Sequence, residues 1–136
     1  HENLKKKTKP LIEQFNKYKV ADGVSVNGKL TAGENIADLA GFAIAFDAYQ
    51  LHLKKTGRKN IDGFTTEQRF FLGATLFERE NTRPEFEKML AINDPHSPSI
   101  FRVNGPASNL SEFYEAFNVK KGDKLYREPK DRVKIW

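Results

Sequence analysis

The chain has 136 residues, 38% of them hydrophobic and 12% aromatic, so it can form one domain with a modest core or a piece of a larger domain. It has no cysteine, which excludes disulfide bonds and thiolate metal sites, and 23 Lys and Arg against 18 acids give it a net charge of +5. The longest apolar run, 39–46, is too short to cross a bilayer, and the charged first residues are not followed by the apolar segment of a signal peptide. We therefore expect no transmembrane segment in this chain and favour, without requiring it, a cytoplasmic location.

The basic residues gather in the ranges 5–9, 54–59 and 120–134, whereas the aromatic residues lie at core spacings and do not alternate with them. Such charge runs are typical of solvated helix ends and loops. We therefore expect no nucleic-acid partner. A small basic nucleic-acid-binding domain is kept as an alternative, which a steep salt dependence of DNA binding would support.

Taken in chain order, the apolar periodicity and the turn residues predict a mainly α fold. The predicted helices cover 5–18, 32–55, 66–77, 84–90 and 110–117, a loop or linker rich in Pro, Ser, Asn and Gly covers 94–109, and an irregular basic tail covers 119–136. The helix over 32–55 is much the longest. We expect several packed helices around this one long buried helix.

Three of the predicted helices begin with the pattern of a capping box, in which the first residue and the residue three positions later each bond to the backbone amide of the other. The pairs are Thr31 with Glu34, Thr65 with Gln68, and Asn109 with Glu112. From local sequence alone, these side chains are expected to satisfy the first amides of their helices.

The longest helix has two faces of different character. Its apolar stripe, at steps of three and four residues, consists of Leu39, Phe42, Phe46, Tyr49 and Leu53. A second stripe has Glu34 and Asp38 one turn apart, followed by Gly41, Ala45 and Ala48, whose small side chains let another helix approach closely. Acids that face a packed helix need a partner, and a metal ion is one such partner. From the residues alone, capping by Glu34 and a helix-surface position for Asp38 are the favoured alternatives.

Several stretches together resemble the neprilysin-like zinc metallopeptidases of the M13 family. The range 33–41, Gly-Glu-Asn-Ile-Ala-Asp-Leu-Ala-Gly, resembles the zinc-ligand motif G-E-N-x-A-D-x-G-G. The range 94–109, Asp-Pro-His-Ser-Pro-Ser-Ile-Phe-Arg-Val-Asn-Gly-Pro-Ala-Ser-Asn, is similar to the family's D-x-H-S-P-x-x-F-R-V-x-G-x-x-S-N, and E-F-x-x-A-F follows at 112–117. Phe70-Phe71-Leu72, Arg83-Pro84-Glu85 and the terminal Trp136 also match, so the resemblance covers nearly the whole chain in the right order.

The resemblance implies roles for four residues and for one zinc ion (Zn2+). Glu34 resembles the third protein zinc ligand, and Asp38 resembles the acid that hydrogen-bonds a ligating histidine and fixes its tautomer. His96 resembles the histidine that stabilises the oxyanion of the tetrahedral intermediate, and Arg102 resembles the arginine that binds a substrate backbone carbonyl. The structural alternatives are a locally hydrogen-bonded loop histidine at position 96 and, for Arg102, a salt bridge that braces the loop, which is compatible with substrate binding.

The H-E-x-x-H motif that such a peptidase requires, with two zinc-binding histidines and a general-base Glu, is absent from this chain. The resemblance therefore implies that residues 1–136 are the C-terminal part of a thermolysin-like zinc endopeptidase catalytic domain, with an oligopeptide substrate and the missing N-terminal part of the same peptidase as partners. We expect this piece alone to be inactive, to lack tightly bound zinc and to self-associate. The lack of the cysteines that extracellular animal members carry near the end favours a bacterial type. A non-catalytic helical binding module that keeps the motif is the alternative.

Three positions depart from the family pattern. Ala40 replaces a motif Gly, and Pro95 replaces an apolar residue before His96. Phe77-Glu78 stand where the family has a Val-Trp pair that helps wall the pocket for the residue after the cleaved bond. The resemblance therefore implies no side-chain preference for the substrate.

Overall fold

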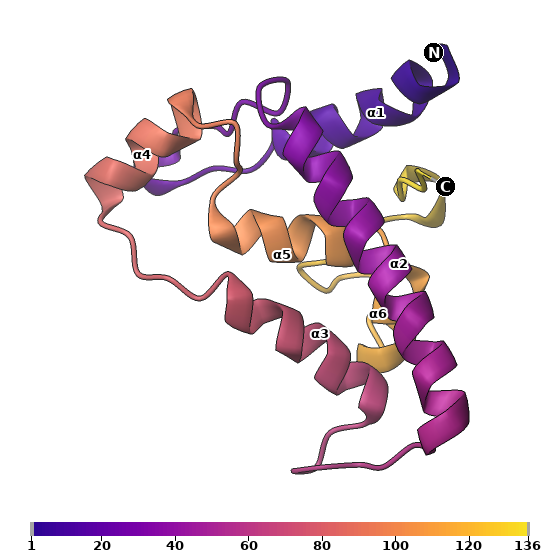
Figure 1. The fold of residues 1–136 in the computed structure, drawn as a ribbon. Coiled ribbons are helices and arrows are strands. Elements are labelled where there is room, and N and C mark those ends of the chain that lie inside the picture. Colours follow the sequence, from indigo (N-terminus) through magenta and orange to yellow (C-terminus); the bar gives the residue numbers. More distant parts are fainter. Residues whose placement is uncertain (1, 136) are drawn as a thin grey trace.

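A computed structural model describes the backbone of residues 2–135 and the side chains of residues 6–135, so the family match at Trp136 lies outside the described residues. Within that range the chain forms six α-helices and two short 3-10 helices, with isolated bridges in place of strands. They are α1 Glu2–Phe15, η1 Ala21–Gly23, α2 Ala32–Thr56, α3 Thr66–Phe77, α4 Pro84–Asn93, α5 Ser99–Ala107, α6 Ser111–Phe117 and η2 Pro129–Asp131. The predicted mainly α fold is confirmed, and Figure 1 shows α2 running along one side of the other helices.

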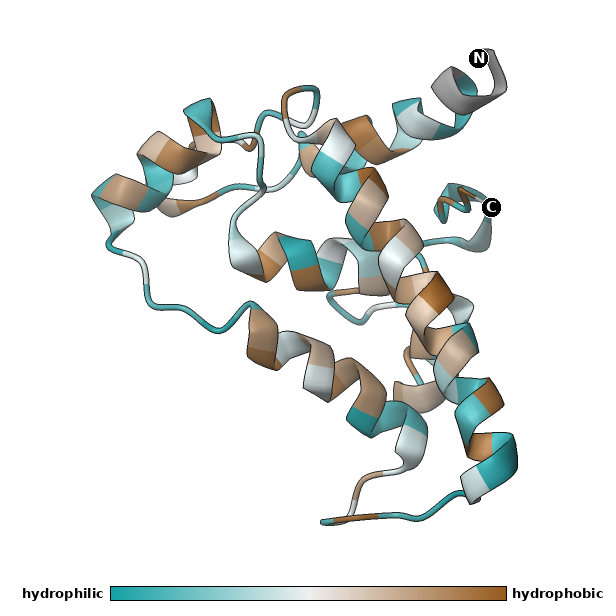
Figure 2. Cartoon of the chain, viewed as in Figure 1, coloured by the Kyte–Doolittle hydropathy of each residue, from teal (hydrophilic) through white to brown (hydrophobic). Residues whose placement is uncertain are grey.

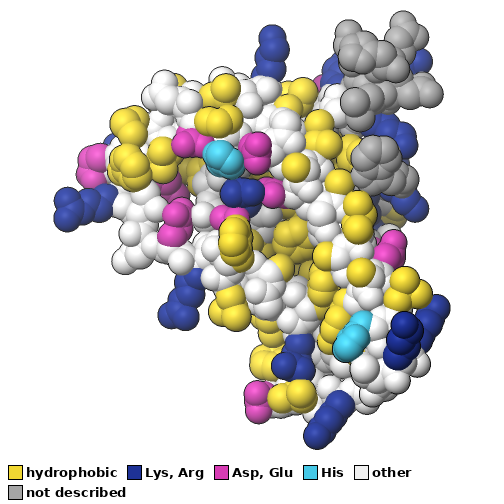
Figure 3. Space-filling model, in the orientation of Figure 1, with side chains coloured by type: hydrophobic (Ala, Val, Ile, Leu, Met, Phe, Trp, Pro, Cys, Tyr) yellow, Lys and Arg dark blue, Asp and Glu magenta, His cyan; other side chains and the backbone are white. Residues whose placement is uncertain are grey.

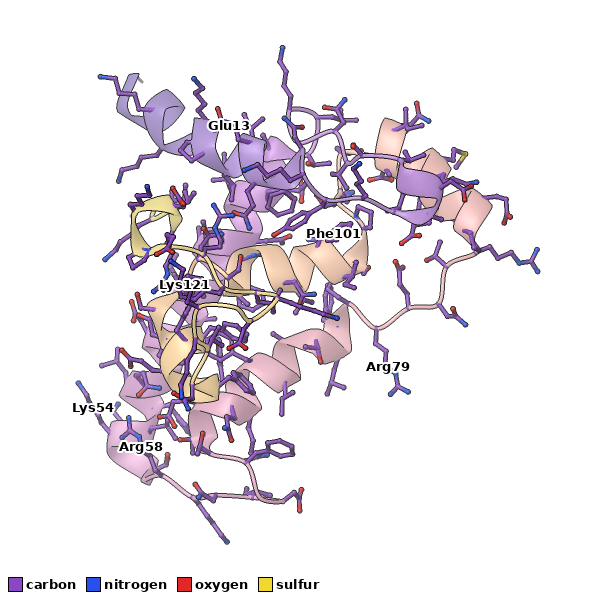
Figure 4. All side chains as sticks on the ribbon, turned by 180° about the vertical axis from the view of Figure 1, so that it is seen from behind. Glu13, Lys54, Arg58, Arg79, Phe101 and Lys121 are labelled. Carbon is purple, nitrogen blue, oxygen red and sulfur yellow. The ribbon has the colours of Figure 1, made fainter. Side chains whose placement is uncertain are left out.

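The first helix is shorter at its end than predicted, because α1 stops at Phe15 and the chain turns before Tyr18. Tyr18 lies beyond the end of α1 and packs against aromatic rings of α1 and α5. Its ring meets Phe15 edge-on with centroids 5.2 Å apart and stacks on Phe101 of α5 at 4.5 Å. Phe101 accordingly lies between α5 and the end of α1 (Figure 4).

The stretch 94–109 contains a helix, α5, where the composition predicted a loop or linker, and this prediction was wrong. Pro98 precedes the helix and Pro106 lies inside it, so local propensity gives little support. Tertiary packing supplies the support instead, since α5 contacts α1, α2 and α3. Gly105 lies so close to the ring of Phe15 that an added Cβ would overlap the ring atoms.

The capping box at Thr65 is confirmed, and the one at Thr31 is wrong. The Thr65 hydroxyl accepts from Gln68 N at 3.2 Å, while Gln68 Oε1 accepts from Thr65 N at 3.0 Å. The Thr31 hydroxyl instead donates to the backbone oxygen of Asn27 at 3.1 Å and accepts from Asn35 Nδ2 at 2.9 Å. These bonds occupy the hydroxyl that a capping box would need.

The capping box predicted at Asn109 is also wrong. Leu110 is the residue that precedes α6, and the buried side chain of Asn109 makes other hydrogen bonds. Its amide nitrogen donates to Gln14 Oε1 at 2.9 Å and to the backbone oxygen of Gly105 at 2.8 Å. Its amide oxygen accepts from Val133 N at 2.8 Å. Asn109 therefore joins α1, α5 and the C-terminal tail.

The core lies where α1 and α2 meet the end of the tail, and it contains Leu11, Phe15, Leu39, Val133 and Ile135. The predicted apolar stripe of α2 faces inward, with Leu39, Phe46 and Leu53 buried. Much of the opposite side of α2 is exposed, and Figure 2 shows hydrophobic residues along α2, α3 and α4. In the described part of the chain, none of the helices combines the length and hydropathy that a membrane span requires.

An aromatic cluster fixes α3 against α2 and α6. Phe71 of α3 packs near Phe46 of α2 at 5.6 Å between ring centroids, and near Phe113 and Phe117 of α6 at 5.4 and 6.2 Å. Edge-to-face and offset aromatic pairs of this kind stabilise packing beyond their buried area. The cluster sets the direction of α3, whose C-terminal end lies beside Arg102 of α5.

Candidate functional site

Glu34 and His96 are far apart in the sequence but meet at the start of α2. Glu34 lies in the first turn of α2, and its Oε2 atom is 3.4 Å from Nε2 of His96. The side chains are 42% and 50% exposed, respectively, so both carry polar atoms that a ligand can reach. Figure 3 shows acidic side chains gathered around a histidine and a basic side chain on one face of the molecule.

Asp94 holds His96 from the opposite side of the ring. Its Oδ1 atom accepts from the backbone N of His96 at 2.7 Å and lies 2.9 Å from the ring Nδ1. The pKa of the Asp94 carboxyl is lowered, first by the backbone amide of His96 and then by its ring, with Arg102 adding to the effect. Asp94 therefore fixes the ring orientation and directs Nε2 toward Glu34.

A buried polar chain ties this loop to α2. The Ser97 hydroxyl donates to Asn35 Oδ1 at 2.8 Å, and Asn35 Nδ2 donates to Thr31 at 2.9 Å. All three side chains are buried, and buried polar groups need such partners. Because Asn35 follows Glu34 and Ser97 follows His96, these hydrogen bonds hold the Glu34 and His96 side chains next to each other.

Asp38 and Arg102 form a bidentate ion pair one helical turn further along α2. Arg102 donates from Nε to Asp38 Oδ2 and from Nη2 to Asp38 Oδ1, both at 2.8 Å. Arg102 Nη1 lies 3.3 Å from Glu78 Oε1 at the end of α3. The pKa of Arg102 is raised, mainly by its hydrogen bonds to Asp38, so the guanidinium group stays protonated.

Two cavities flank this ion pair. One has a volume of about 420 Å³ and lies between the end of α3, α4 and the start of α5, with Asp94, His96 and Arg102 in its wall. The other, about 340 Å³, lies between α2 and α3 and includes Asp38, Gly41 and Ala45. Two of the three small residues of the second stripe of α2, Gly41 and Ala45, therefore line an open groove.

The residues present suit one part of a zinc site. Among the described residues, no three His, Cys, Asp or Glu side chains converge as a metal-binding group. A catalytic zinc requires three protein ligands and an open position. The half-exposed carboxylate of Glu34 fits one of these ligands, and carboxylate oxygen is an accepted zinc donor.

The structure thus brings together all four residues that the sequence singled out, as two linked pairs. The predicted salt bridge of Arg102 is present, and its partner is Asp38 of α2. Sequence reasoning missed Asp94, Asn35 and Ser97 as supports, although the Asp-x-His spacing of residues 94 and 96 is a local signal. It also gave no sign that Glu78 would contact Arg102, because this contact depends on the packing of α3.

The fold and these motifs belong to one class of protein: the chain is a member of peptidase family M13, whose family model matches residues 1–133. It is 41% identical over 138 aligned positions to endothelin-converting enzyme 1 of Rattus norvegicus, covering 99% of this chain and 18% of that protein. It is 38% identical over 136 positions to the neutral endopeptidase of Lactococcus lactis subsp. lactis (strain IL1403), covering 100% of this chain and 20% of that protein.

Solved structures agree with this assignment. The zinc metalloprotease ZMP1 of Mycobacterium tuberculosis, in complex with an inhibitor, superposes with a TM-score of 0.94 at 40% identity, covering 99% of this chain and 22% of that one. PepO from Lactobacillus rhamnosis gives 0.78 at 34% identity, covering 99% and 20%. The chain therefore spans about a fifth of the length of these relatives.

Proposed function

We propose that this chain is the C-terminal part of a zinc-dependent metalloendopeptidase that hydrolyses peptide bonds in oligopeptides. In this proposal Glu34 is the third protein zinc ligand, and the remainder of the peptidase supplies the other two. Membership of family M13 and the likeness to a zinc metalloprotease support the class of activity. The pairing of the half-exposed Glu34 carboxylate with His96 Nε2 is the observation that carries the assignment of the site.

When bound, zinc polarises the scissile carbonyl and activates a water molecule. His96 donates from Nε2 to the carbonyl oxygen as negative charge develops there. Asp94 supports this role, because its bonds to the backbone and ring of His96 hold Nε2 toward the site.

Asp38 orients a histidine ligand of the zinc in this proposal, and Arg102 binds a backbone carbonyl of the substrate. Each Asp38 oxygen accepts one bond from Arg102, and a carboxylate oxygen can accept a second. Asp38 therefore has the capacity to orient a histidine ligand of the zinc while it holds Arg102. Arg102 has five N–H donors, so it can bind a substrate backbone carbonyl while its bonds to Asp38 persist.

The proposal is tested by comparing His96→Ala with His52→Ala in the whole peptidase. His52 is an exposed histidine in the last two turns of α2 and serves as the matched control. We expect His96→Ala to lower turnover about a hundredfold or more, while zinc content and substrate affinity change little. We expect His52→Ala to leave all three unchanged.

Unchanged turnover in the His96→Ala enzyme would contradict the catalytic role and favour a purely structural histidine. A whole protein that lacks any H-E-x-x-H motif and cleaves no peptide would instead support the non-catalytic binding module. These two results are distinguishable, because the first requires an active enzyme and the second excludes one.

A further inference from the structure

The 420 Å³ cavity beside the ion pair has a wall of opposite charge to the chain as a whole. Four acids line it, namely Glu78, Glu80, Glu87 and Asp94, against the two arginines Arg79 and Arg102. The chain carries a net charge of +5, so a negative wall is a local feature and not a consequence of composition. A cavity lined by one sign of charge concentrates ligands of the opposite sign.

The two arginines only partly offset the charge of this wall. Arg102 faces two carboxylates, because it donates two hydrogen bonds of 2.8 Å to Asp38 and its Nη1 lies 3.3 Å from Glu78 Oε1. Arg79 is exposed, and its side chain extends away from the helices (Figure 4). One guanidinium against the carboxylates of Asp38 and Glu78 leaves this cluster with a net negative charge, to which the other acids of the cavity wall add.

Glu78 is the acid best placed to act on a bound peptide. Its side chain is only 14% exposed, and Oε1 lies 3.3 Å from Arg102 Nη1. Glu78 lines both the 420 Å³ cavity and the adjoining 340 Å³ groove between α2 and α3. A peptide whose backbone is bound by Arg102 therefore places a neighbouring side chain within reach of the Glu78 carboxylate.

We propose that Glu78 is a specificity-determining residue that directs this site toward peptides with a lysine or arginine side chain next to the cleaved bond. The inference rests on the proposed function, since it deepens the description of the same substrate site. The ammonium or guanidinium group of the peptide would pair with a carboxylate that is mostly shielded from water, where charge-assisted hydrogen bonds are strong. Charge repulsion by the cavity wall would reject acidic side chains.

The test measures kcat/KM and peptide affinity for three peptides that differ only in having Lys, norleucine or Glu next to the scissile bond. The whole peptidase is compared with Glu78→Gln and with Glu85→Gln. The glutamine in the Glu78→Gln variant keeps an amide oxygen that can accept from Arg102 Nη1, so the substitution removes the charge and retains the positioning contact. Glu85 is exposed in the first turn of α4 and does not line either cavity, so it controls for net charge.

We expect the wild type and Glu85→Gln to prefer the Lys peptide to the norleucine peptide. In Glu78→Gln we expect this ratio to be about tenfold smaller, both in kcat/KM and in affinity. The Glu85→Gln enzyme should keep the wild-type activity on all three peptides. An equal change in kcat/KM for all three peptides in the Glu78→Gln enzyme would overturn the specificity role. A wild-type enzyme without preference for the Lys peptide would also overturn it. A wild type that cleaves none of the peptides would overturn the proposed function itself, and this inference with it.

Discussion

Asp38 and Arg102 form the strongest charged contact among the residues of the site. Their side chains are 17% and 21% exposed, so the pair is shielded but keeps contact with water. Because breaking such a pair leaves a charged group short of partners, we expect Asp38→Ala to lower the free energy of unfolding by about 1–3 kcal/mol. Urea denaturation of the 136-residue chain measures this change.

A double-mutant cycle over Asp38→Ala and Arg102→Ala gives the coupling of the two residues directly. We expect a coupling energy of about 1 kcal/mol or more, since the residues share two hydrogen bonds. The exposed pair of Lys9 and Glu13, 3.9 Å apart on α1, is the control and should give less than about 0.5 kcal/mol. Equal coupling in both cycles would show that the Asp38–Arg102 pair has no special structural role.

The contacts of Asp94 with His96 predict that the free energy of unfolding depends on pH. The hydrogen bonds from His96 hold the pKa of Asp94 below its usual range. A carboxyl with a lowered pKa in the folded state stabilises that state above its unfolded pKa, and the contribution is lost as the pH falls through the folded pKa. We expect Asp94→Asn to be less stable than the wild type at about pH 6, and the difference to shrink on acidification below about pH 4. Thermal unfolding followed from about pH 6 to about pH 3 measures it, and a difference that stays constant over this range would contradict the account.

At the scale of the elements, the packing of α5 on α1 fixes where Arg102 lies. Gly105→Ala places a methyl group against the ring of Phe15, and we expect it to lower stability by about 1–3 kcal/mol through overpacking. Gly73→Ala in α3 is the matched control, because apart from its chain neighbours and the backbone of its own helix no atom lies within 4 Å of its added Cβ. That control should be neutral or stabilising by up to about 1 kcal/mol, as expected for Gly replaced by Ala in a helix.

Denaturation of both variants of the 136-residue chain tests this prediction. Near-ultraviolet circular dichroism adds a second reading, because a shift of α5 would disturb the stacked rings of Tyr18 and Phe101. Equal stability of the Gly105→Ala chain and the wild type would mean that α1 and α5 can separate at little cost.

The sequence predicted elements well where the determining contacts are local. The capping box at Thr65 involves residues only three positions apart, and the apolar stripe of α2 repeats at the helical period. The sequence therefore predicted both. The cap at Thr31 failed because Asn27 and Asn35 compete for the same hydroxyl. The helix α5 was missed because its stability comes from contacts with α1 and α2, which its Pro- and Gly-containing sequence does not reveal.

In the candidate site, too, the sequence identified residues but did not predict their long-range contacts. The resemblance to family motifs drew attention to Glu34, Asp38, His96 and Arg102, but it did not say how they would be paired. Asp38 and Arg102 are 64 positions apart, and their contact depends on the crossing of α2 and α5. The contact of Glu78 with Arg102 arises at a position where the chain departs from the family pattern, so no motif could predict it.

At the scale of the whole molecule, large hydrophobic side chains remain exposed on four helices. They are Ile44 and Leu51 on α2, Leu72, Leu76 and Phe77 on α3, Phe86, Met89 and Ile92 on α4, and Ile100 on α5. Exposed apolar surface of this extent is typical of a surface that another chain segment covers. We expect the isolated 136-residue chain to fold, to self-associate, and to show neither peptide cleavage nor tightly bound zinc.

Light scattering, a peptide-cleavage assay and metal analysis of the purified chain test these expectations together. Glu34 alone provides too few ligands, because a catalytic zinc requires three. A monomeric chain would contradict the expected self-association. Stoichiometric zinc together with cleavage would show that the chain forms a complete site from residues other than those assigned.

The zinc content of the whole peptidase is the measurement that tests the central claim most directly. Metal analysis by mass spectrometry is made on the wild type, on Glu34→Ala, and on Asp47→Ala as a control for an exposed acid on the same helix. The assignment of Glu34 as a zinc ligand predicts one zinc per chain in the wild type and in Asp47→Ala, and loss of zinc in Glu34→Ala. Full zinc occupancy in Glu34→Ala would contradict it.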